Sequence, residues 1–315
     1  MTYEDLITEK ELSPSLYEKL LKDGDVNFSN PNLLINGDFK INQRGKMEYI
    51  FDTTSTPTVH YSVDRWVTHR LLTDKNKITV LDNGIQLEST VENANVRIRQ
   101  KLEEDMTKQL LGKTLTFSVK ILSDCEKVFL NILDNTNINV TNKTFLNVKS
   151  NDVLSFTFKV PINTTRLEVQ FGTANPNVCI AEYAKLEIGD KATPFIPRHY
   201  AEELALCQRY FEKININSIS GVVINEGNLP TSQVSADFKV QKRVVPTIYN
   251  SNLVPNGNVM VHLMGESRQL ECTMTIPRVT IEGLRFDAIS TIEGASTIGR
   301  LAVVESIVYA DAEIY

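Results

Sequence analysis

The four histidines are the residues whose type would most directly suit a metal site or acid–base chemistry, because neutral imidazole binds metal ions and titrates near neutral pH. They are His60, His69, His199 and His262, far apart in the sequence, and no H-E-x-x-H pattern joins any two of them. The chain has no G-x-S-x-G sequence for a nucleophilic serine and no glycine-rich nucleotide-binding motif. We therefore expect solvated or packed histidines, no catalytic residues, no metal ligands and no cofactor.

The acidic residues are a second possible source of chemistry. The sequence holds 39 of them, and two carboxylates that face each other could hydrolyse a glycosidic bond. That reaction depends on the distance between the two groups in space, which the order of residues does not give. No pair stands out, so cleavage of a polysaccharide is kept as an alternative without assigned residues.

Trp66, the only tryptophan, could stack against a sugar ring. Val63 and Val67 flank it in an apparent strand, which favours a buried position over a ligand platform. Exposed tyrosines and asparagines in loops are better candidates for sugar contacts, and the sequence does not rank them. The ligand-binding residues are therefore left unknown.

Composition narrows the class of protein. With 315 residues, 42% of them hydrophobic and 23% charged, the chain is typical of a soluble globular protein of about two domains. A net charge of −6 argues against nucleic acid as a partner, because phosphate binding needs clustered Lys and Arg. No run approaches the roughly 20 apolar residues of a membrane span, so we expect folding in a cytoplasm and no membrane insertion. The scattered Cys125, Cys179, Cys207 and Cys272 are expected to be reduced packing residues.

The elements that must position any site are mostly strands. In KITVLDNGIQLES, two alternating runs are joined by Asn83-Gly84, the favoured residues of a tight hairpin. Further strands are expected in NVRIRQKL, KTLTFSVKIL, KVFLNIL, DVLSFTFKVP, TRLEVQFG and CIAEYAKLEIG. In NLLINGDFKINQRG, we expect a strand over residues 33–35, a bend at 36–38 and a second short strand. Regularly spaced short strands predict an antiparallel jelly-roll sandwich over residues 31–197.

Residues 1–30 form a leader with one predicted short helix. In LSPSLYEKLLK, Ser13 is placed as N-cap, Pro14 takes the first helical position and Leu12 can pack against Tyr17. So short a helix is marginal alone, which favours a leader that docks onto another protein or a neighbouring subunit. The alternative is a terminal segment that only precedes the fold.

After residue 197 the periodicity changes. Residues 198–214 are predicted as a linking helix with a stripe of spacing four and three, which we interpret as an oligomerisation seam: Tyr200, Leu204, Cys207, Phe211 and Ile214. The alternative is that this stripe packs on the chain's own domains. Alternating segments then return over residues 215–315 and predict a smaller C-terminal β-sandwich head. The expected fold class is mostly β.

Several segments together resemble tail-fibre and receptor-binding proteins of tailed phages, prophages and phage-tail-like bacteriocins. These segments are NLLINGDFKINQRG, YSVDRW, AKLEIGDKATPFIPRHYAEELALCQRYFEK, RVVPTI and the closing ADAEIY. The resemblance implies that NLLINGDF is the first strand of a jelly roll similar to carbohydrate-binding modules and that LEIGDKATPF is its last. It also implies a homotrimer. Such jelly rolls often hold a structural calcium at an acidic pair before the last strand, where this sequence has Glu182-Tyr183.

The function that these observations favour is a tail receptor-binding protein that adheres to host cell-surface polysaccharide or a cell-wall glycoconjugate without cleaving it. It would be located in the virion tail or a tail-like particle, attached to other tail or baseplate proteins through residues 1–30. A structural tail or baseplate component is the first alternative, because a leader, a jelly roll and a head also suit a spacer. A polysaccharide depolymerase is the second, and the long β-helical repeats that would favour it are missing.

Overall fold

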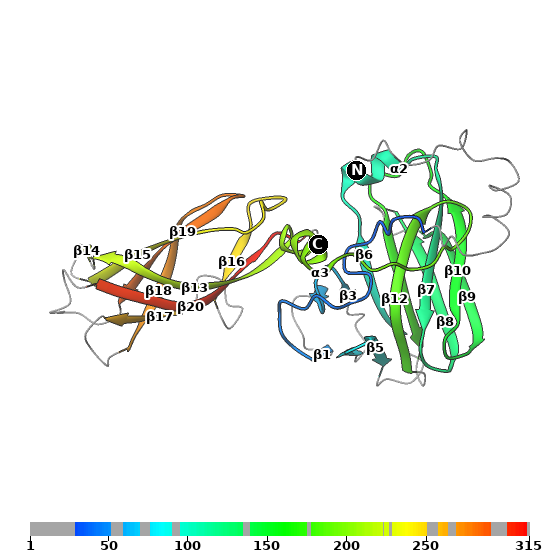
Figure 1. The fold of residues 1–315 in the computed structure, drawn as a ribbon, viewed down its shortest axis with the longest axis horizontal. Helices are drawn as coiled ribbons and strands as arrows, with labels where there is room; N and C mark the ends of the chain where they lie inside the picture. Colours follow the sequence, from blue (N-terminus) through cyan, green and yellow to red (C-terminus); the bar gives the residue numbers. More distant parts are fainter. Residues whose placement is uncertain are drawn as a thin grey trace, which may run out of the picture.

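The computed structural model describes residues 29–51, 59–69, 76–89, 95–134, 139–174, 178–222, 224–226, 229–250, 258–263, 269–290 and 301–313. Two β-domains lie end to end along the long axis of the molecule, with one short helix between them (Figure 1). The leader helix predicted within residues 1–30 lies outside the described residues.

The N-terminal domain consists of two six-stranded antiparallel sheets. Across the first sheet the strands are β1 (Glu48–Phe51), β4 (Asn76–Leu81), β5 (Gly84–Ser89), β12 (Val178–Ile188), β7 (Thr114–Ile121) and β10 (Val153–Lys159). Across the second they are β2 (Val59–Tyr61), β3 (Val67–His69), β6 (Asn95–Lys101), β11 (Glu168–Ala174), β8 (Cys125–Leu133) and β9 (Asn139–Val148). The predicted jelly-roll sandwich is confirmed.

Alternation along the strands places one apolar face of each sheet in a shared core. In β4 the buried positions alternate with partly exposed ones, so Ile78 and Val80 face inward while Lys77 and Thr79 do not. Large side chains from both sheets and from the segments before them fill the space between the sheets, among them Phe39, Trp66, Ile98, Phe117, Leu130, Phe171 and Leu186. The four cysteines are buried and free, as predicted.

The β4–β5 hairpin forms where it was predicted, with its turn shifted by one residue. Leu81 pairs with Gly84, so the two turn residues are Asp82 and Asn83 rather than Asn83 and Gly84. Gly84 has a φ of 149°, and a Cβ on it would lie 2.1 Å from the carbonyl oxygen of Ala181 in β12. The glycine is therefore needed where β5 passes close to β12, not in the turn itself.

The opening segment is not the first strand of the jelly roll, and this prediction is wrong. Residues 32–37 do run beside β12, but the side chain of Asn32 takes the place of a peptide group: its Nδ2 donates to Ala184 O and its Oδ1 accepts from Leu186 N, both at 3.0 Å. The left-handed backbone at Asn36 and Phe39, with φ of 56° and 62°, then prevents regular pairing.

Several elements of the domain were not predicted, namely β1, β2, helix α2 and strand β9. Helix α2 (Glu104–Leu110) has Glu104 and Asp105 in its first turn, where acidic side chains favour the positive end of the helix dipole. Strand β9 is rich in Asn, Thr and Lys and pairs only with β8, at the edge of the second sheet. Edge strands commonly carry polar side chains, which hides their alternation in the sequence.

The linking helix is shorter than predicted. Helix α3 (Tyr200–Gln208) begins after His199, whose ring accepts a hydrogen bond from Ala201 N, and β13 (Phe211–Val222) starts three residues after its end. Pairing of β13 with β20 along its length holds Phe211 and Ile214 in a strand, so tertiary pairing outweighs the local helical spacing. No helix among the described residues combines the length and apolar character needed to cross a membrane.

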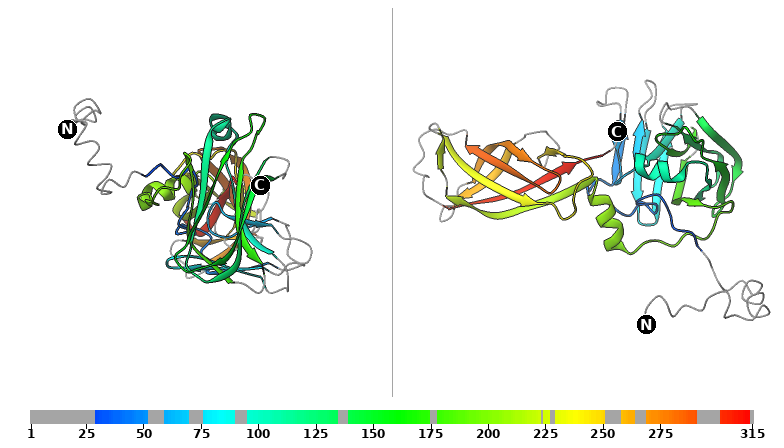
Figure 2. Two further views of the ribbon diagram at one scale, coloured as in Figure 1. Left: turned by 90° about the vertical axis from the view of Figure 1, so that its right-hand side faces the viewer. Right: turned by 90° about the horizontal axis from the view of Figure 1, so that it is seen from above.

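The C-terminal head contains one antiparallel sheet of eight strands. Across it the strands are β13, β20 (Leu301–Asp311), β17 (Asn258–Leu263), β18 (Gln269–Val279), β19 (Gly283–Ser290), β15 (Leu229–Asp237) and β14 (Ile224–Glu226), with β16 (Thr247–Tyr249) also paired to β20. The sheet curls around its own core, which includes Phe238, Met274 and Phe286 (Figure 2). The head is β and antiparallel as predicted, but it is one curled sheet rather than two stacked sheets.

Candidate functional site

The five residues predicted as an oligomerisation seam do not share one face. Phe211 and Ile214 belong to β13 and are only 1% and 7% exposed, and Cys207 in α3 is fully buried. Leu204 is half-buried, whereas Tyr200 is 61% exposed. A helical stripe at a three-fold axis is therefore not formed by these residues, and three of them pack inside their own chain. The homotrimer itself stays a prediction.

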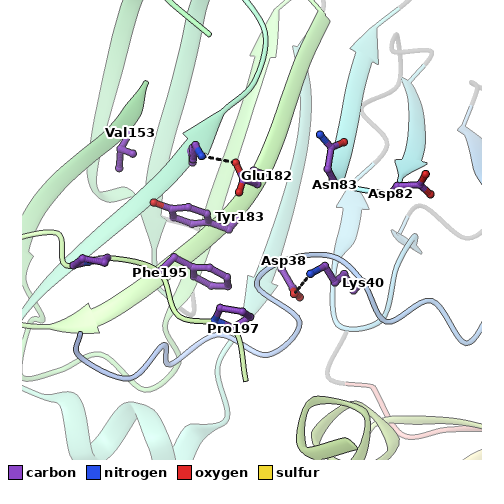
Figure 3. A pocket seen from close by; sticks show the side chains of 11 residues that line it. Asp38, Lys40, Asp82, Asn83, Val153, Glu182, Tyr183, Phe195 and Pro197 are labelled. Carbon is purple, nitrogen blue, oxygen red and sulfur yellow. Dashed lines mark ion pairs between the residues drawn. The ribbon is translucent and has the colours of Figure 1, made fainter. Parts of the chain in front are cut away.

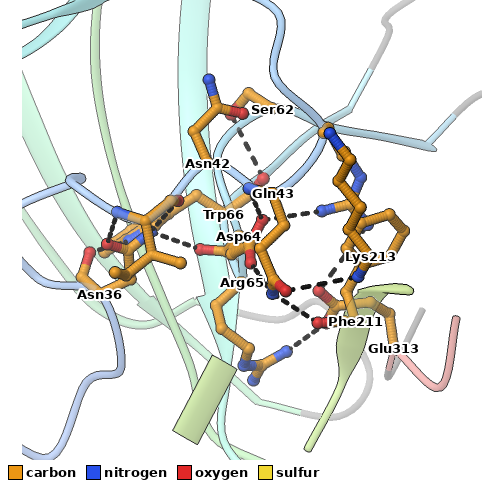
Figure 4. A network of polar contacts seen from close by, with 12 residues as sticks. Asn36, Asn42, Gln43, Ser62, Asp64, Arg65, Trp66, Phe211, Lys213 and Glu313 are labelled. Carbon is orange, nitrogen blue, oxygen red and sulfur yellow. Dashed lines mark hydrogen bonds and ion pairs between the residues drawn. The ribbon is translucent and has the colours of Figure 1, made fainter. Parts of the chain in front are cut away.

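Most of the motif segments meet where the jelly roll, α3 and the head join. Asn36 is fully buried there, and its side chain bonds to both backbone groups of Ile41 and to the carbonyl oxygen of Asp64, each at 2.9 Å (Figure 4). The carbonyl of Asn36 accepts the indole N–H of Trp66 at 2.8 Å. Trp66 is 0% exposed and packs against Phe39, with ring centroids 5.2 Å apart, so its predicted core position is confirmed.

A buried ion pair connects this junction to the end of the chain. Arg65 Nη1 lies 2.5 Å from Glu313 Oε2, both side chains are almost fully buried, and the Arg65 guanidinium stacks on the ring of Tyr210. Arg44 lies nearby over the ring of Phe211 and faces Glu313 at 3.9 Å. These contacts give the motif residues a structural role in holding the domains together.

Asp64 is a buried carboxyl group at the junction whose pKa is raised by its surroundings. It accepts hydrogen bonds from the backbone and side chain of Gln43 at 3.1 and 2.5 Å, and Arg44 lies 3.6 Å away. Burial raises the pKa of Asp64 to about 7, although Arg44 and Gln43 act in the opposite direction. The junction therefore contains a carboxyl group that titrates near neutral pH.

A second buried cluster of polar side chains holds the LEIGDKATPF segment in its folded-back conformation. Lys185 and Glu187 lie two residues apart in β12, so they share one face of the sheet, and their charged groups are 3.1 Å apart. Lys185 Nζ also donates to Thr193 Oγ1 at 2.6 Å, and Glu187 accepts from Thr193 N at 2.9 Å. The cluster turns the chain back over the face of β12 and fixes the position of Phe195.

A β-bulge in β12 shapes the surface next to this cluster. Ala181 pairs with Ile121 and Tyr183 with Lys120, so Glu182 is the extra residue. Successive residues of a regular strand point to opposite faces, whereas a bulge redirects side chains. Glu182 and Tyr183 consequently line the same pocket, and Glu182 Oε2 lies 2.6 Å from Lys120 Nζ.

The pocket beside this bulge has a volume of about 490 Å³ and is open to solvent. Asp82 and Asn83 of the hairpin turn line it on one side, and Asp38 and Lys40 of the opening segment lie between them and the aromatic residues (Figure 3). Lys40 is 3.4 Å from Asp38, whereas the carboxylate of Asp82 has neither a hydrogen bond nor an ion pair within the described part of the chain.

Two aromatic rings form the apolar wall of the pocket. Tyr183 and Phe195 are stacked, with centroids 4.4 Å apart and planes 8° from parallel. Val153 of β10 and the prolines that flank Phe195 extend this apolar surface. The pocket thus combines carboxylate acceptors and ammonium donors with a flat apolar surface, an arrangement that can bind a ligand rich in hydroxyl groups and C–H faces.

The acidic pair of calcium-binding jelly rolls is not reproduced here. Glu182 lies within β12 rather than before it, and its carboxylate is neutralised by the ammonium group of Lys120. Among the described residues, no group of three or more His, Cys, Asp and Glu side chains is arranged to hold a metal ion. The residues present at this position do not fit a calcium site.

Sequence reasoning assigned none of the pocket residues. The hairpin was predicted with Asn83 and Gly84 in its turn, so Asp82 was not expected there, and the position of the turn against β12 depends on long-range pairing. The bulge at Glu182 has no sequence signal, because the segment alternates like a regular strand on either side of it. Loop asparagines were favoured for sugar contact, and Asn83 lines the pocket.

Comparisons with known proteins found no matching family model and no matching curated protein. Among solved structures, a family 4 carbohydrate-binding module is 16% identical, with 49% of this chain and 98% of that chain covered and a TM-score of 0.30. The C-terminal family 22 carbohydrate-binding module of Clostridium thermocellum Xyn10B is 10% identical, with coverages of 51% and 96% and a TM-score of 0.31.

A third similar structure is the enzymatically active domain of tailspike protein 4 of bacteriophage CBA120. It is 12% identical, with 50% of this chain and 21% of that chain covered and a TM-score of 0.30.

Proposed function

We propose that this protein is a tail receptor-binding protein of a phage or phage-tail-like particle that adheres to a host cell-surface glycan without cleaving it. The pocket between the bulge of β12 and the β4–β5 hairpin is the proposed glycan site. The observation that carries this proposal is the pairing, in one open pocket, of a flat aromatic wall with several charged groups.

The chemistry of a sugar matches both parts of the pocket. Its hydroxyl groups donate to carboxylates and accept from ammonium groups, and the C–H face of its ring packs on an aromatic ring. The carboxylate of Asp82 accepts no hydrogen bond from any described residue, so it is available to a ligand. The side chain of Lys40 beside it is mostly exposed. The lining holds three carboxylates and two ammonium groups, so an uncharged polysaccharide of the bacterial surface is the ligand class we propose.

The tail role rests on the resemblance of the motif segments to tail-fibre and receptor-binding proteins. In this proposal residues 1–30 attach the protein to other tail or baseplate proteins, and three copies assemble into a homotrimer. Several weak sites on one particle would then bind together through effective concentration.

A structural tail component is the alternative with a specific observation in its favour. The motif residues converge on a buried junction that fixes one domain against the other, as a rigid spacer would require. A spacer needs no glycan site, so a measurement of glycan binding distinguishes a receptor-binding protein from a structural component.

The first test is a glycan array that carries bacterial capsular, lipopolysaccharide and cell-wall polysaccharides. Wild-type protein should bind at least one of them, and Asp82→Ala should weaken that binding about tenfold, because a hydrogen bond to a charged group contributes about 1.5–3 kcal/mol. Asp190→Ala removes an exposed carboxylate outside the pocket and should leave binding unchanged.

Three outcomes would contradict parts of the proposal. Absence of binding to every arrayed polysaccharide, together with no adhesion to bacterial cells, would favour the structural component. Equal losses in Asp82→Ala and Asp190→Ala would move the site away from this pocket. Release of oligosaccharides from the bound polysaccharide would identify a depolymerase instead.

A further inference from the structure

A second hollow adjoins the proposed glycan pocket. It has a volume of about 450 Å³ and is lined by the opening segment from Phe39 to Met47, by the end of β4 and by Tyr200. Lys40 and Asp82 line both this hollow and the first pocket, so the two hollows are adjacent. We refer to the two together as the groove, which extends from the face of β12 to the start of α3.

Tyr200 is the residue that gives this second hollow its chemistry. Tyr200 is the first residue of α3, and its side chain is 61% exposed. Exposure of a large aromatic ring to water is unfavourable, so a ring in this position is available to stack against a ligand. The phenol makes no hydrogen bond with any described residue. Met47, which is 56% exposed, adds a second apolar side chain to the same hollow.

We infer that the groove binds a linear glycan chain, with one part of the chain in the first pocket and a further sugar unit stacked on Tyr200. This inference rests on the proposed function and extends it, because it specifies a chain of several sugars rather than a single terminal sugar. Lys40 and Asp82 lie where the two hollows meet and can bind the hydroxyl groups of the sugars that connect the two ends.

The position of Tyr200 also makes the groove depend on the linking helix. Arg198 Nη1 donates to Leu34 O at 3.0 Å and lies 3.0 Å from Glu203 Oε2, and Glu203 accepts from Asn36 N. These contacts fix the first turn of α3 against the opening segment that lines the rest of the hollow. A ligand that reaches Tyr200 would therefore contact both the jelly roll and the linker.

The test uses fragments of the polysaccharide that wild-type protein binds on the array, separated by length from one to eight sugars. Affinity for wild-type protein should increase with length beyond the disaccharide. Tyr200→Ala should lower the affinity for the long fragments about tenfold, as for loss of one aromatic stacking contact, and leave the affinity for monosaccharide and disaccharide unchanged. Tyr200→Phe retains the ring and should bind like wild-type protein.

Ile162→Ala is the matched control, because Ile162 is 82% exposed and lies outside both hollows. Unchanged affinity of Tyr200→Ala for the long fragments would overturn the inference while the first pocket remains the glycan site. Equal losses for short and long fragments would place Tyr200 in a general structural role. Failure of the wild-type protein to bind any arrayed polysaccharide would remove the proposed function, and the inference with it.

Discussion

Among single residues, two asparagine side chains form the hydrogen bonds to buried backbone groups that regular strand pairing provides elsewhere in the fold. Asn36 has a left-handed backbone and is buried, yet its amide satisfies three backbone groups of two other residues. Asn32 similarly replaces a peptide group beside β12. Buried polar groups must be paired, so these two asparagines permit an irregular segment inside a β-sandwich.

Asn36→Ala should lower the free energy of unfolding by about 3–5 kcal/mol, because it leaves several buried backbone groups without partners. Chemical denaturation of the full chain measures this difference. Asn151→Ala is the control, since Asn151 also has a positive φ, of 72°, but is exposed. Its cost should be about 1 kcal/mol, from the backbone alone. Equal effects of the two substitutions would mean that backbone conformation, not hydrogen bonding, accounts for the role of Asn36.

At the scale of elements, the proposed site depends on how three segments meet. The bulge redirects Glu182, the close approach of β5 to β12 positions the hairpin turn, and the Lys185–Glu187–Thr193 cluster folds the chain back with Phe195. The bulge and the cluster both lie within residues 181–193, but the pocket forms only where the hairpin turn and the opening segment meet them. The pocket is thus a product of strand pairing in the first sheet.

Gly84→Ala should disturb this arrangement. Its Cβ would lie 2.1 Å from the carbonyl oxygen of Ala181, so β5 or β12 must shift, and we expect a loss of about 2–4 kcal/mol in unfolding free energy. Gly112→Ala is the matched control, because Gly112 also has a positive φ but its nearest neighbour is 3.9 Å from the added atom. Denaturation curves that coincide for the two variants would contradict a packing requirement at Gly84.

At the scale of the whole molecule, the junction joins the jelly roll to the head through buried charges. Asp64 and Arg65 lie far from Glu313 in the sequence, yet Figure 4 shows the three residues together in one polar network. The ring of Tyr210, which follows α3, packs against the guanidinium of Arg65. The side chain of Gln43 also donates to the carbonyl oxygen of Phe211, at 2.6 Å. The relative position of the two domains is therefore held by specific contacts as well as by the linker.

Glu313→Ala should destabilise the chain by about 3–5 kcal/mol, because the buried guanidinium of Arg65 loses its counter-charge. The double variant Arg65→Met with Glu313→Ala should cost less than the sum of its two single variants, since it leaves no unpaired charge. Lys149→Ala, which breaks an exposed pair with Asp124, should leave the unfolding midpoint unchanged. An unfolding midpoint of Glu313→Ala equal to that of wild-type protein would refute the role of the pair.

Stability should also change with pH through Asp64. Because its pKa rises from 3.8 in the unfolded chain to about 7 in the folded chain, the folded state binds a proton more tightly between these values. This contribution is complete below the unfolded pKa and is lost as the pH rises through 7. Burial raises the pKa of Asp311 in the same direction, although Arg44 opposes it.

The melting temperature of wild-type protein should therefore fall between pH 6 and pH 8, and Asp64→Asn should reduce this dependence. Glu103 does not interfere, since its pKa is lowered: burial raises it, but hydrogen bonds from Arg209 and Tyr210 outweigh that effect. Its stabilisation is present above its unfolded pKa, and is lost only at more acidic pH. A pH dependence equal in wild type and Asp64→Asn would assign the effect to other groups.

The fold class could be predicted without the structure, because alternation with a period of two is a local property of each strand. The sequence predicted the strands around KTLTFSVKIL, DVLSFTFKVP and CIAEYAKLEIG, the β4–β5 hairpin and the burial of Trp66. The segments at residues 32–45, 61–66 and 184–213 were selected for their resemblance to tail-fibre and receptor-binding proteins, and residues from all three meet at one junction.

Other features depend on contacts between distant segments, which local sequence patterns do not record. Phe211 and Ile214 have helical spacing, but pairing with β20 adds hydrogen bonds along a whole strand and places them in β13. Leu33–Ile35 have the character of a strand, but their segment makes backbone bonds to β12 at Leu33 and Gly37, and the side chain of Asn32 supplies two further bonds in place of a regular ladder. The pocket arises from a bulge and from contacts between residues more than 100 positions apart, so its members became visible only in the folded chain.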